Sequence, residues 1–258
     1  MSTFEVHQIA TRVDNYVYLL REDTSGKAAV VDPSDAQPVL EALDRLGWEL
    51  SHILATHHHN DHVGGVPELK AATGCTVVGP RADRDRIPNI EVEVGDGDTY
   101  MFHDAEAVVF DTPGHTRGHI AYWFAESKAL FCGDTLFALG CGRLFEGTAE
   151  QMWNSLSKFK AVPDDTWVYC AHEYTQSNAR FAVDLDPGNV ELKAYSDDVD
   201  RKRAAGERTV PSLMGRERKT NPFLRADAPD LASAIGMTGK DPVEIFAEVR
   251  TRKDDFRA

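Results

Sequence analysis

The chain has 258 residues, of which 42 are acidic and 28 basic, so its formal net charge is −14. This excess of negative charge argues against nucleic acid as a partner, because phosphate groups require a basic face, while the length suits one large layered domain with a smaller appended part. No apolar run approaches the roughly 20 residues of a membrane-spanning helix, and residues 1–10 show neither the basic nor the apolar segment of a signal peptide, so we expect a cytoplasmic protein without membrane contact.

The N-terminal part alternates between strand and helix patterns. Apolar residues recur at helical spacing from Val39 to Leu46, and Gly47 is a typical stop signal. Short β-branched or aromatic runs, separated by turn residues, predict strands at 4–9, 16–20, 28–31 and 52–55. We therefore expect a sheet that includes an α/β unit.

The same alternation continues beyond residue 65. A short helix is expected from Val66 to Ala72, ending at Gly74, whereas residues 81–90 are polar and loop-like. Further strands are predicted at 76–78, 100–102, 107–110, 120–124 and 129–131.

The segment Thr56–His62 is the strongest chemical signal in the chain. It contains four histidines and one aspartate within seven residues, directly after the apolar run that ends at Ala55. His57 and His59 flank His58, so an extended backbone sends the outer two side chains one way and His58 the other. We interpret this segment as a metal-binding turn between a strand and a helix, with Asp61 and His62 at the start of the helix.

Three later strands end in the same way. An apolar run precedes each of His115, Asp134 and His172, and functional groups collect at strand ends in α/β folds. Nitrogen and oxygen donors without a thiolate suit zinc, iron or manganese. The set is large enough for two ions, which Asp134 could bridge. Two ions about 3.5–4 Å apart would activate a water and polarise a carbonyl, which is hydrolase chemistry.

Asp32 and the four cysteines lead to two further expectations. Asp32 also follows a strand and would either orient a metal-bound imidazole or begin the next helix. The four cysteines are widely spaced without a CxxC pair, so we expect reduced packing residues: Cys75, Cys132, Cys141 and Cys170.

The ordered set from His57 to His172 resembles the ligand set of the metallo-β-lactamase superfamily, and flanking segments resemble the glyoxalase II (hydroxyacylglutathione hydrolase) family. The segments that carry the closer resemblance are 14–16, 56–65, 112–119, 132–137, 140–148, 172–175, 221–223 and 253–256. The resemblance implies a four-layer αββα sandwich with a C-terminal helical domain. We expect a metal-binding hydrolase domain at residues 1–174 and a helical substrate-binding domain at residues 175–258, with helices at 175–185, 190–205 and 242–256.

The resemblance also implies the substrate contacts. The basic residues that hold the glycine carboxylate of glutathione correspond to Arg143, Arg250 and Lys253, and the contacting tyrosine corresponds to Tyr174. Phe145 departs from the family, which commonly has tyrosine there, so one hydrogen bond to glutathione is in question and another thiol carrier stays open. The C-terminal part from Lys193 is slightly basic beside an acidic body, which indicates either a charged helix surface or a site for a small anion.

The implied mechanism uses two divalent ions, with zinc expected and iron or manganese compatible. His57, His59 and His115 would hold one ion, Asp61, His62 and His172 the other, and Asp134 with a metal-bridging hydroxide would join them. Asp61 and Asp134 are therefore the expected catalytic residues. The expected reaction converts S-D-lactoylglutathione, the hydroxyacylglutathione of methylglyoxal detoxification, to D-lactate and glutathione.

Two alternatives stay open at this point. One is a glutathione persulfide dioxygenase with a single iron held by two histidines and a carboxylate. The other is a non-catalytic binding protein of the same fold. The expected binding partner is a small-molecule glutathione thioester. For the oligomeric state we expect a monomer, with a dimer as the alternative.

Overall fold

The computed structural model describes residues 2–257 and divides the chain into two compact units. The first unit runs to Thr112 and also includes Thr116–Gly133, whereas the second holds Pro113–His115 and the chain from Asp134 onward. This division does not coincide with a boundary after residue 174, so the two domains expected from the sequence stay a prediction.

The first unit contains a mixed sheet in the order β1-β2-β3-β4-β5-β6. The strands β1, β2 and β3 pair antiparallel, and β3 to β6 pair parallel. Their bounds are Phe4–Thr11 (β1), Asn15–Glu22 (β2), Lys27–Val31 (β3), Glu49–Leu54 (β4), Thr76–Pro80 (β5) and Val92–Val94 (β6). The predicted strands of this region are confirmed, while β6 was not predicted.

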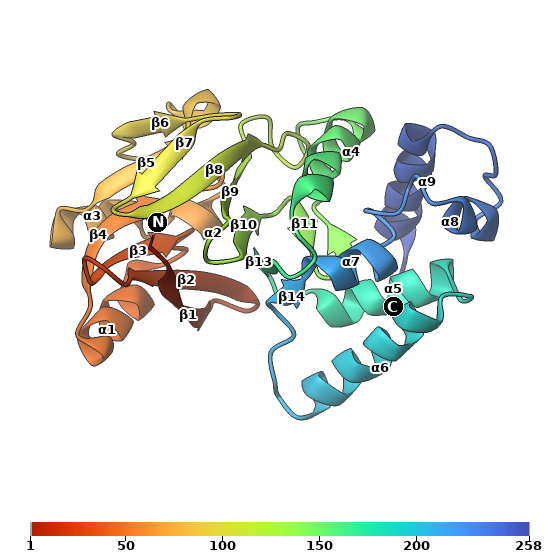
Figure 1. The fold of residues 1–258 in the computed structure, drawn as a ribbon, viewed down its shortest axis with the longest axis horizontal. Helices are drawn as coiled ribbons and strands as arrows, with labels where there is room; N and C mark the ends of the chain where they lie inside the picture. The colour runs from red at the N-terminus through yellow and green to blue at the C-terminus, as the bar shows by residue number, and fades with distance from the viewer. Residues whose placement is uncertain (1, 258) are drawn as a thin grey trace. The chain divides into compact units, whose positions relative to one another are not determined.

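Helices α1 (Ala36–Leu46) and α3 (Val66–Thr73) cover one face of this sheet (Figure 1). Buried Val39 and Leu43 of α1 belong to the same apolar cluster as Val17 and Leu19 of β2. The helix ends as predicted at Gly47, whose φ of 65° places it in the left-handed region that glycine tolerates best.

A second, antiparallel sheet in the first unit packs against the other face. Side chains alternate along β2, so Tyr18 points opposite to Val17 and lies 5.6 Å from the ring of Phe131. Across the same interface the Tyr122 hydroxyl donates to the carbonyl of Ala55 at 3.0 Å. Within the first unit, the strands of this sheet are β7 (Thr99–Phe102), β8 (Ala105–Asp111), β9 (Ile120–Phe124) and β10 (Ala129–Gly133).

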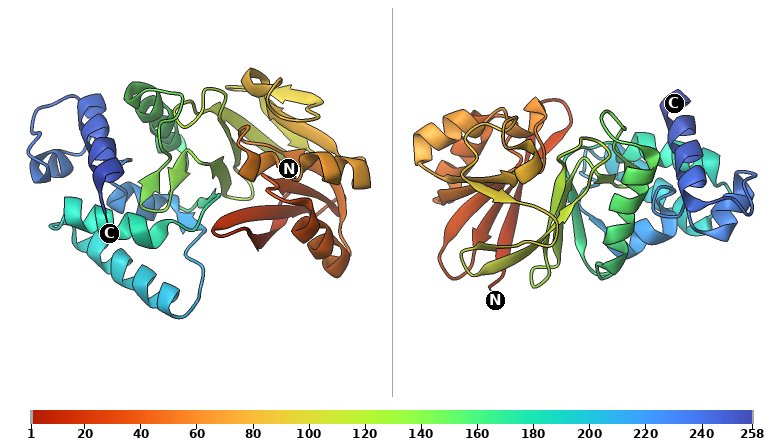
Figure 2. Two further views of the ribbon diagram at one scale, coloured as in Figure 1. Left: turned by 180° about the vertical axis from the view of Figure 1, so that it is seen from behind. Right: turned by 90° about the horizontal axis from the view of Figure 1, so that it is seen from above.

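The second unit is mainly helical. Helices α5 and α6 lie side by side (Figure 2) over a cluster that includes Leu139, Ala182 and Tyr195. The elements are β11 (Leu136–Phe137), β12 (Gly140–Cys141), α4 (Ala149–Lys158), β13 (Trp167–Cys170), α5 (Thr175–Leu185), α6 (Val190–Ala204), β14 (Ser212–Leu213), α7 (Met214–Thr220), α8 (Pro229–Ala234) and α9 (Pro242–Asp255). The three predicted helices α5, α6 and α9 are confirmed.

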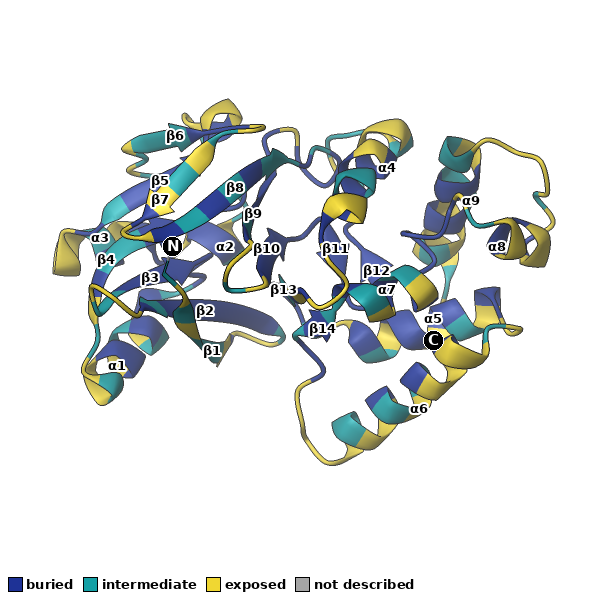
Figure 3. Cartoon of the chain, in the orientation of Figure 1, coloured by how far each residue is buried: buried dark blue, intermediate teal, exposed yellow. Residues whose placement is uncertain are grey.

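The remaining short elements are α2 (Asn60–Val63) and two 3₁₀ turns, η1 (Arg81–Asp83) and η2 (Phe159–Ala161). Burial concentrates on the strands, while α6 exposes much of its surface (Figure 3). Within residues 2–257, the structure contains no helix that is both long and apolar enough to cross a membrane.

Candidate metal centre

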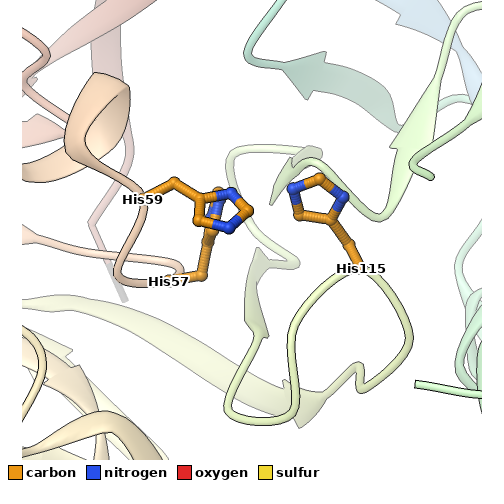
Figure 4. A group of neighbouring side chains, drawn as sticks. All are labelled: His57, His59 and His115. Carbon is orange, nitrogen blue, oxygen red and sulfur yellow. The ribbon is translucent and has the colours of Figure 1, made fainter. Parts of the chain in front are cut away.

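The loop after β4 carries the first group of ligand-type side chains. The rings of His57 and His59 lie together (Figure 4), with centroids 4.8 Å apart, and the ring of His62 on α2 lies 4.0 Å from that of His57. His57 and His62 are completely buried, and His59 is half-buried. This segment therefore gathers imidazoles in the interior of the first unit, as its spacing predicts.

Asp32 determines how two of these imidazoles present their nitrogens. Because β3 and β4 are parallel neighbours, Asp32 at the end of β3 lies beside Thr56, and its carboxylate accepts from Thr56 N and Oγ1, both at 2.7 Å. Nδ1 of His62 lies 3.1 Å from Asp32 Oδ2. Since an ionised carboxylate only accepts, His62 donates from Nδ1 and keeps its lone pair on Nε2.

Thr56 transmits the same constraint to His57. Its hydroxyl donates to Asp32, so it accepts from Nδ1 of His57 at 3.0 Å. His57 consequently also keeps its lone pair on Nε2, the form that a metal ion requires. Of the two roles left open for Asp32, these contacts support the orienting one.

His58 lies against a segment that the sequence presented only as a polar loop. Its Nδ1 lies 3.1 Å from Asp83 Oδ2, and its Nε2 lies 3.3 Å from Nη1 of Arg86. Asp83 is fully buried and packs against Gly118, where a Cβ atom would lie 2.1 Å from the carboxylate. Both ring nitrogens of His58 thus serve hydrogen bonds that anchor the histidine loop.

His119 contacts the first group of histidines. Its ring stacks on His57 at 4.6 Å, and its Nδ1 lies 2.9 Å from Thr112 Oγ1. Gly133 makes room for this arrangement, because a Cβ atom there would lie 2.3 Å from Thr56 Oγ1. Gly133 directly precedes Asp134 in the sequence.

The second unit carries the other ligand-type residues, each beyond the end of a strand. Asp134 Oδ2 lies 3.4 Å from Nε2 of His115 and 3.4 Å from Nε2 of His172. All three side chains are buried. His115, which projects from its own loop in Figure 4, donates from Nδ1 to the Arg143 carbonyl at 2.9 Å, so its Nε2 also carries the lone pair. A carboxylate placed between two such nitrogens suits a shared ligand.

Aromatic side chains flank these two histidines. Tyr174 stacks on His172 at 4.7 Å with nearly parallel rings, and Phe145 meets the ring of His115 at 5.2 Å. Tyr174 is 38% and Phe145 64% exposed, which is unusual for large apolar residues. Exposed aromatic surface beside buried polar ligands is typical of a binding site.

The three predicted cations belong to one cluster of the second unit. Arg250 is buried and donates to the Cys141 carbonyl at 3.0 Å and to Asp254 Oδ1 at 2.9 Å. Arg143 is largely exposed, with Nε 3.8 Å from the same Asp254 oxygen. Lys253 lies near Ser177, and burial, with Arg250 and Arg143 nearby, lowers its pKa to about 8. Arg250 therefore supports the cluster, while Arg143 presents charge to solvent.

Comparison with known proteins reveals similarity over the whole chain. Residues 10–172 match the model of the metallo-beta-lactamase superfamily, and residues 173–256 match that of the hydroxyacylglutathione hydrolase C-terminus. The chain is 58% identical to a hydroxyacylglutathione hydrolase of Rhodospirillum rubrum, covering 99% of this chain and 100% of that one. It is 58% identical to a protein of the same name from Methylococcus capsulatus, covering 98% and 99%.

Solved structures show the same fold. The crystal structure of ETHE1 from Myxococcus xanthus is similar with a TM-score of 0.69 and 25% identity, covering 96% of this chain and 90% of that one. The B3 metallo-beta-lactamase BLEG-1 is similar with a TM-score of 0.67 and 22% identity, covering 85% and 99%.

Proposed function

Because this chain belongs to the hydroxyacylglutathione hydrolase family of the metallo-β-lactamase superfamily, we propose that it hydrolyses S-(2-hydroxyacyl)glutathione to a 2-hydroxy acid and glutathione. The observation that carries this proposal is the 58% identity to hydroxyacylglutathione hydrolases over 99% of the chain. The match to the C-terminal family model adds to it, because this model is named for the same hydrolase. S-D-lactoylglutathione is the proposed substrate and D-lactate the product.

The chain is a hydrolase with a metallo-β-lactamase fold that binds divalent metal. The donor set fits such ions, since it consists of imidazoles and carboxylates, most of which are buried. We propose that His57, His59 and His115 hold one ion, that Asp61, His62 and His172 hold a second, and that Asp134 is shared. Zinc is the proposed metal. Two bound ions would lower the pKa of a water toward 7 and polarise the thioester carbonyl.

The protein itself contributes orientation and a local positive field. Asp32 and Thr56 fix the tautomers of His62 and His57, and the Arg143 carbonyl fixes that of His115. The leaving thiolate needs little help from an acid, because a thiol of this type has a pKa near 8.5. Water supplies the hydroxyl of the acid and the proton of the thiol, so the reaction requires no oxidant.

The substrate end of the site is proposed to lie at the cationic cluster. Arg143 and Lys253 would attract the glutathione carboxylate, while Phe145 and Tyr174 would flank the thioester arm. Arg250 would act beside them by holding Cys141 and Asp254 in place. A positive cluster is needed here because the chain as a whole carries a charge of −14.

A hydrolysis panel combined with metal analysis tests this proposal. Purified protein should release free thiol from lactoylglutathione faster than from non-glutathione thioesters, and it should contain two divalent ions per chain. One iron per chain, oxygen uptake on glutathione persulfide and no thiol release would instead identify a dioxygenase. Asp134→Asn with unchanged turnover would overturn the metal mechanism, whereas a metal-loaded protein that releases no thiol from any thioester would favour a non-catalytic binding protein.

We further propose that the enzyme works in the cytoplasm as a monomer. The four cysteines are buried and none forms a disulfide within residues 2–257, which agrees with a reducing compartment, where disulfides are rare. Cell fractionation tests the location, and light scattering on the purified chain tests the oligomeric state.

A further inference from the structure

The turn between β1 and β2 contacts the helix that carries two proposed ligands. Asn15, the first residue of β2, is buried, and its Nδ2 donates to Asp61 Oδ2 at 3.2 Å and to the Asp61 carbonyl at 3.3 Å. From the same turn, Nη2 of Arg12 donates to the carbonyls of Ser34 at 2.8 Å and Asn60 at 3.4 Å. This turn thus holds the start of α2 through both backbone and side chain.

Asp61 differs from its neighbours in how it is restrained. Its side chain is 34% exposed, whereas His57 and His62 are completely buried. Packing and the hydrogen bonds to Thr56 and Asp32 therefore hold the two imidazoles, but a partly exposed carboxylate at the start of a four-residue helix can rotate into water. The Asn15 amide favours the rotamer in which Asp61 Oδ2 lies 3.6 Å from Nε2 of His62.

The residue type matches this task. A buried amide is costly unless it is hydrogen-bonded, and here its donors meet an acceptor carboxylate. A neutral donor orients the carboxylate without competing as a cation for the oxygen lone pairs, as lysine or arginine would.

We propose that Asn15 is a positioning residue for the second metal ion, acting through the Asp61 carboxylate. This inference rests on the dinuclear site of the proposed function. Groups that orient a metal ligand typically change metal affinity 10–100-fold when removed. Loss of the Asn15 amide should therefore lower the affinity for the second ion about 10-fold or more. The affinity for the ion assigned to His57, His59 and His115 should change little.

The test compares four variants in the full chain. Asn15→Leu keeps the volume and removes the amide, and Asn15→Ala removes both. Asn60→Ala is the matched control, because Asn60 is an exposed residue of the same type on the same short helix. Asp61→Ala marks the effect of losing the carboxylate itself. Each protein is stripped of metal, its melting temperature is recorded, and zinc binding is measured by titration calorimetry and elemental analysis.

The expected result is a weakened second binding step in both Asn15 variants, with the first step and the metal-free melting temperature close to those of Asn60→Ala. Wild-type affinity at both steps in Asn15→Leu would overturn the inference alone, provided that Asp61→Ala loses one ion. A parallel loss of both ions with a lowered metal-free melting temperature would also overturn it, since that indicates a structural role. A wild-type chain that binds a single ion would overturn the dinuclear proposal itself.

Discussion

At the scale of single residues, Asp32 links several residues of the candidate metal centre. Its two oxygens accept from Thr56 and face Nδ1 of His62, and Thr56 in turn accepts from His57. One carboxylate therefore sets two tautomers, that of His62 directly and that of His57 through Thr56. Asp32 has a left-handed backbone with φ at 49°, which is unfavourable for a residue other than glycine. Its hydrogen bonds offset this conformational cost.

Thr56→Val tests this chain of hydrogen bonds. Valine keeps the shape but removes the hydroxyl, which leaves Asp32 Oδ2 and His57 Nδ1 each without one partner. We expect the free energy of unfolding of the metal-free protein to fall by about 1–3 kcal/mol, as measured by urea unfolding. Thr56→Ser should restore most of it, and equal stability of the valine and serine variants would show that the hydroxyl contributes little.

Lys253 gives the site a predicted pH dependence. Its folded pKa of about 8 lies below the usual 10.5, because burial and the nearby Arg250 and Arg143 disfavour the charged form, although Asp254 opposes them. KM for the anionic thioester should rise between pH 7 and 9 as the charge is lost, with little change in kcat. Lys253→Arg should flatten this profile, whereas a profile unchanged in Lys253→Met would exclude Lys253 as its origin.

The same shift affects stability with a defined sign. Because the folded pKa is lowered, the unfolded chain binds more protons between pH 8 and 10.5. Lys253 therefore destabilises the fold below about pH 8, and this penalty decreases as the pH rises toward 10.5.

A substitution at Phe145 tests which thiol carries the acyl group. The ring is 64% exposed beside His115, so a hydroxyl added there would reach solvent or substrate without a packing clash. If glutathione is the carrier, Phe145→Tyr should lower KM for lactoylglutathione about 2–10-fold through one hydrogen bond. Steady-state kinetics of both proteins, with Phe145→Leu as control, decide this. A raised KM in the tyrosine variant would favour a different carrier.

At the scale of elements, helices α1, α3, α5, α6 and α9 were predicted, whereas α4, α7 and α8 were not. The bounds of α5 match the predicted residues 175–185, and α1, α6 and α9 differ from prediction by only a few residues. Helix α4 was missed although Thr148 and Gln151 form a capping box in the structure. Helix α7 offers no apolar stripe, because its central buried residue is Glu217.

The buried carboxylate of Glu217 on α7 holds the β11–β12 hairpin, which lies far from it in the sequence. It accepts from the backbone N–H of Leu139 at 2.8 Å, from Asn221 at 3.0 Å and from the Tyr195 hydroxyl at 3.3 Å. Leu139 lies between β11 and β12 with φ at 57°, and burial raises the pKa of Glu217. This contact holds the hairpin that follows Asp134.

Glu217→Ala should therefore destabilise the protein by at least about 3 kcal/mol, since several buried donors lose their acceptor. Glu217→Gln should cost less, because it retains the shape and one acceptor. The matched control is Glu191→Ala, because the Glu191 carboxylate is 60% exposed in an ion pair with Lys219. This substitution should lower the free energy of unfolding by less than about 1 kcal/mol. Denaturant unfolding measures all three, and similar losses for Glu217→Ala and Glu191→Ala would contradict this view.

At the scale of the whole molecule, the predicted fold class and family are confirmed. The two family models together span residues 10–256, in agreement with a metallo-β-lactamase fold that is followed by a helical region. Each compact unit holds part of the proposed ligand set, with His57, His59, Asp61 and His62 in the first and His115, Asp134 and His172 in the second.

Metal removal should thus affect the stability of the whole chain. Ligands that bind only the folded state stabilise it by about 2.7–4.1 kcal/mol at 100–1,000 times Kd, which corresponds to roughly 5–15 °C in Tm for a chain of this size. Calorimetry before and after chelation, with zinc added back, measures this shift. An unchanged Tm together with full turnover after chelation would contradict a metal-dependent site.

The sequence by itself determined the family, the chemistry and the strand ends that carry it, because ligand types, spacing and apolar runs are local properties. The tertiary structure alone showed the contacts between segments far apart in the chain: Asp32 with His62, Asp83 with His58, Asn15 with Asp61 and Glu217 with Leu139. No periodicity encodes such pairs, since they depend on which strand ends the sheet brings together. Arg250 illustrates the same limit: the family resemblance implied a substrate contact, which stays a prediction, whereas its burial against Cys141 and Asp254 is visible only in the structure.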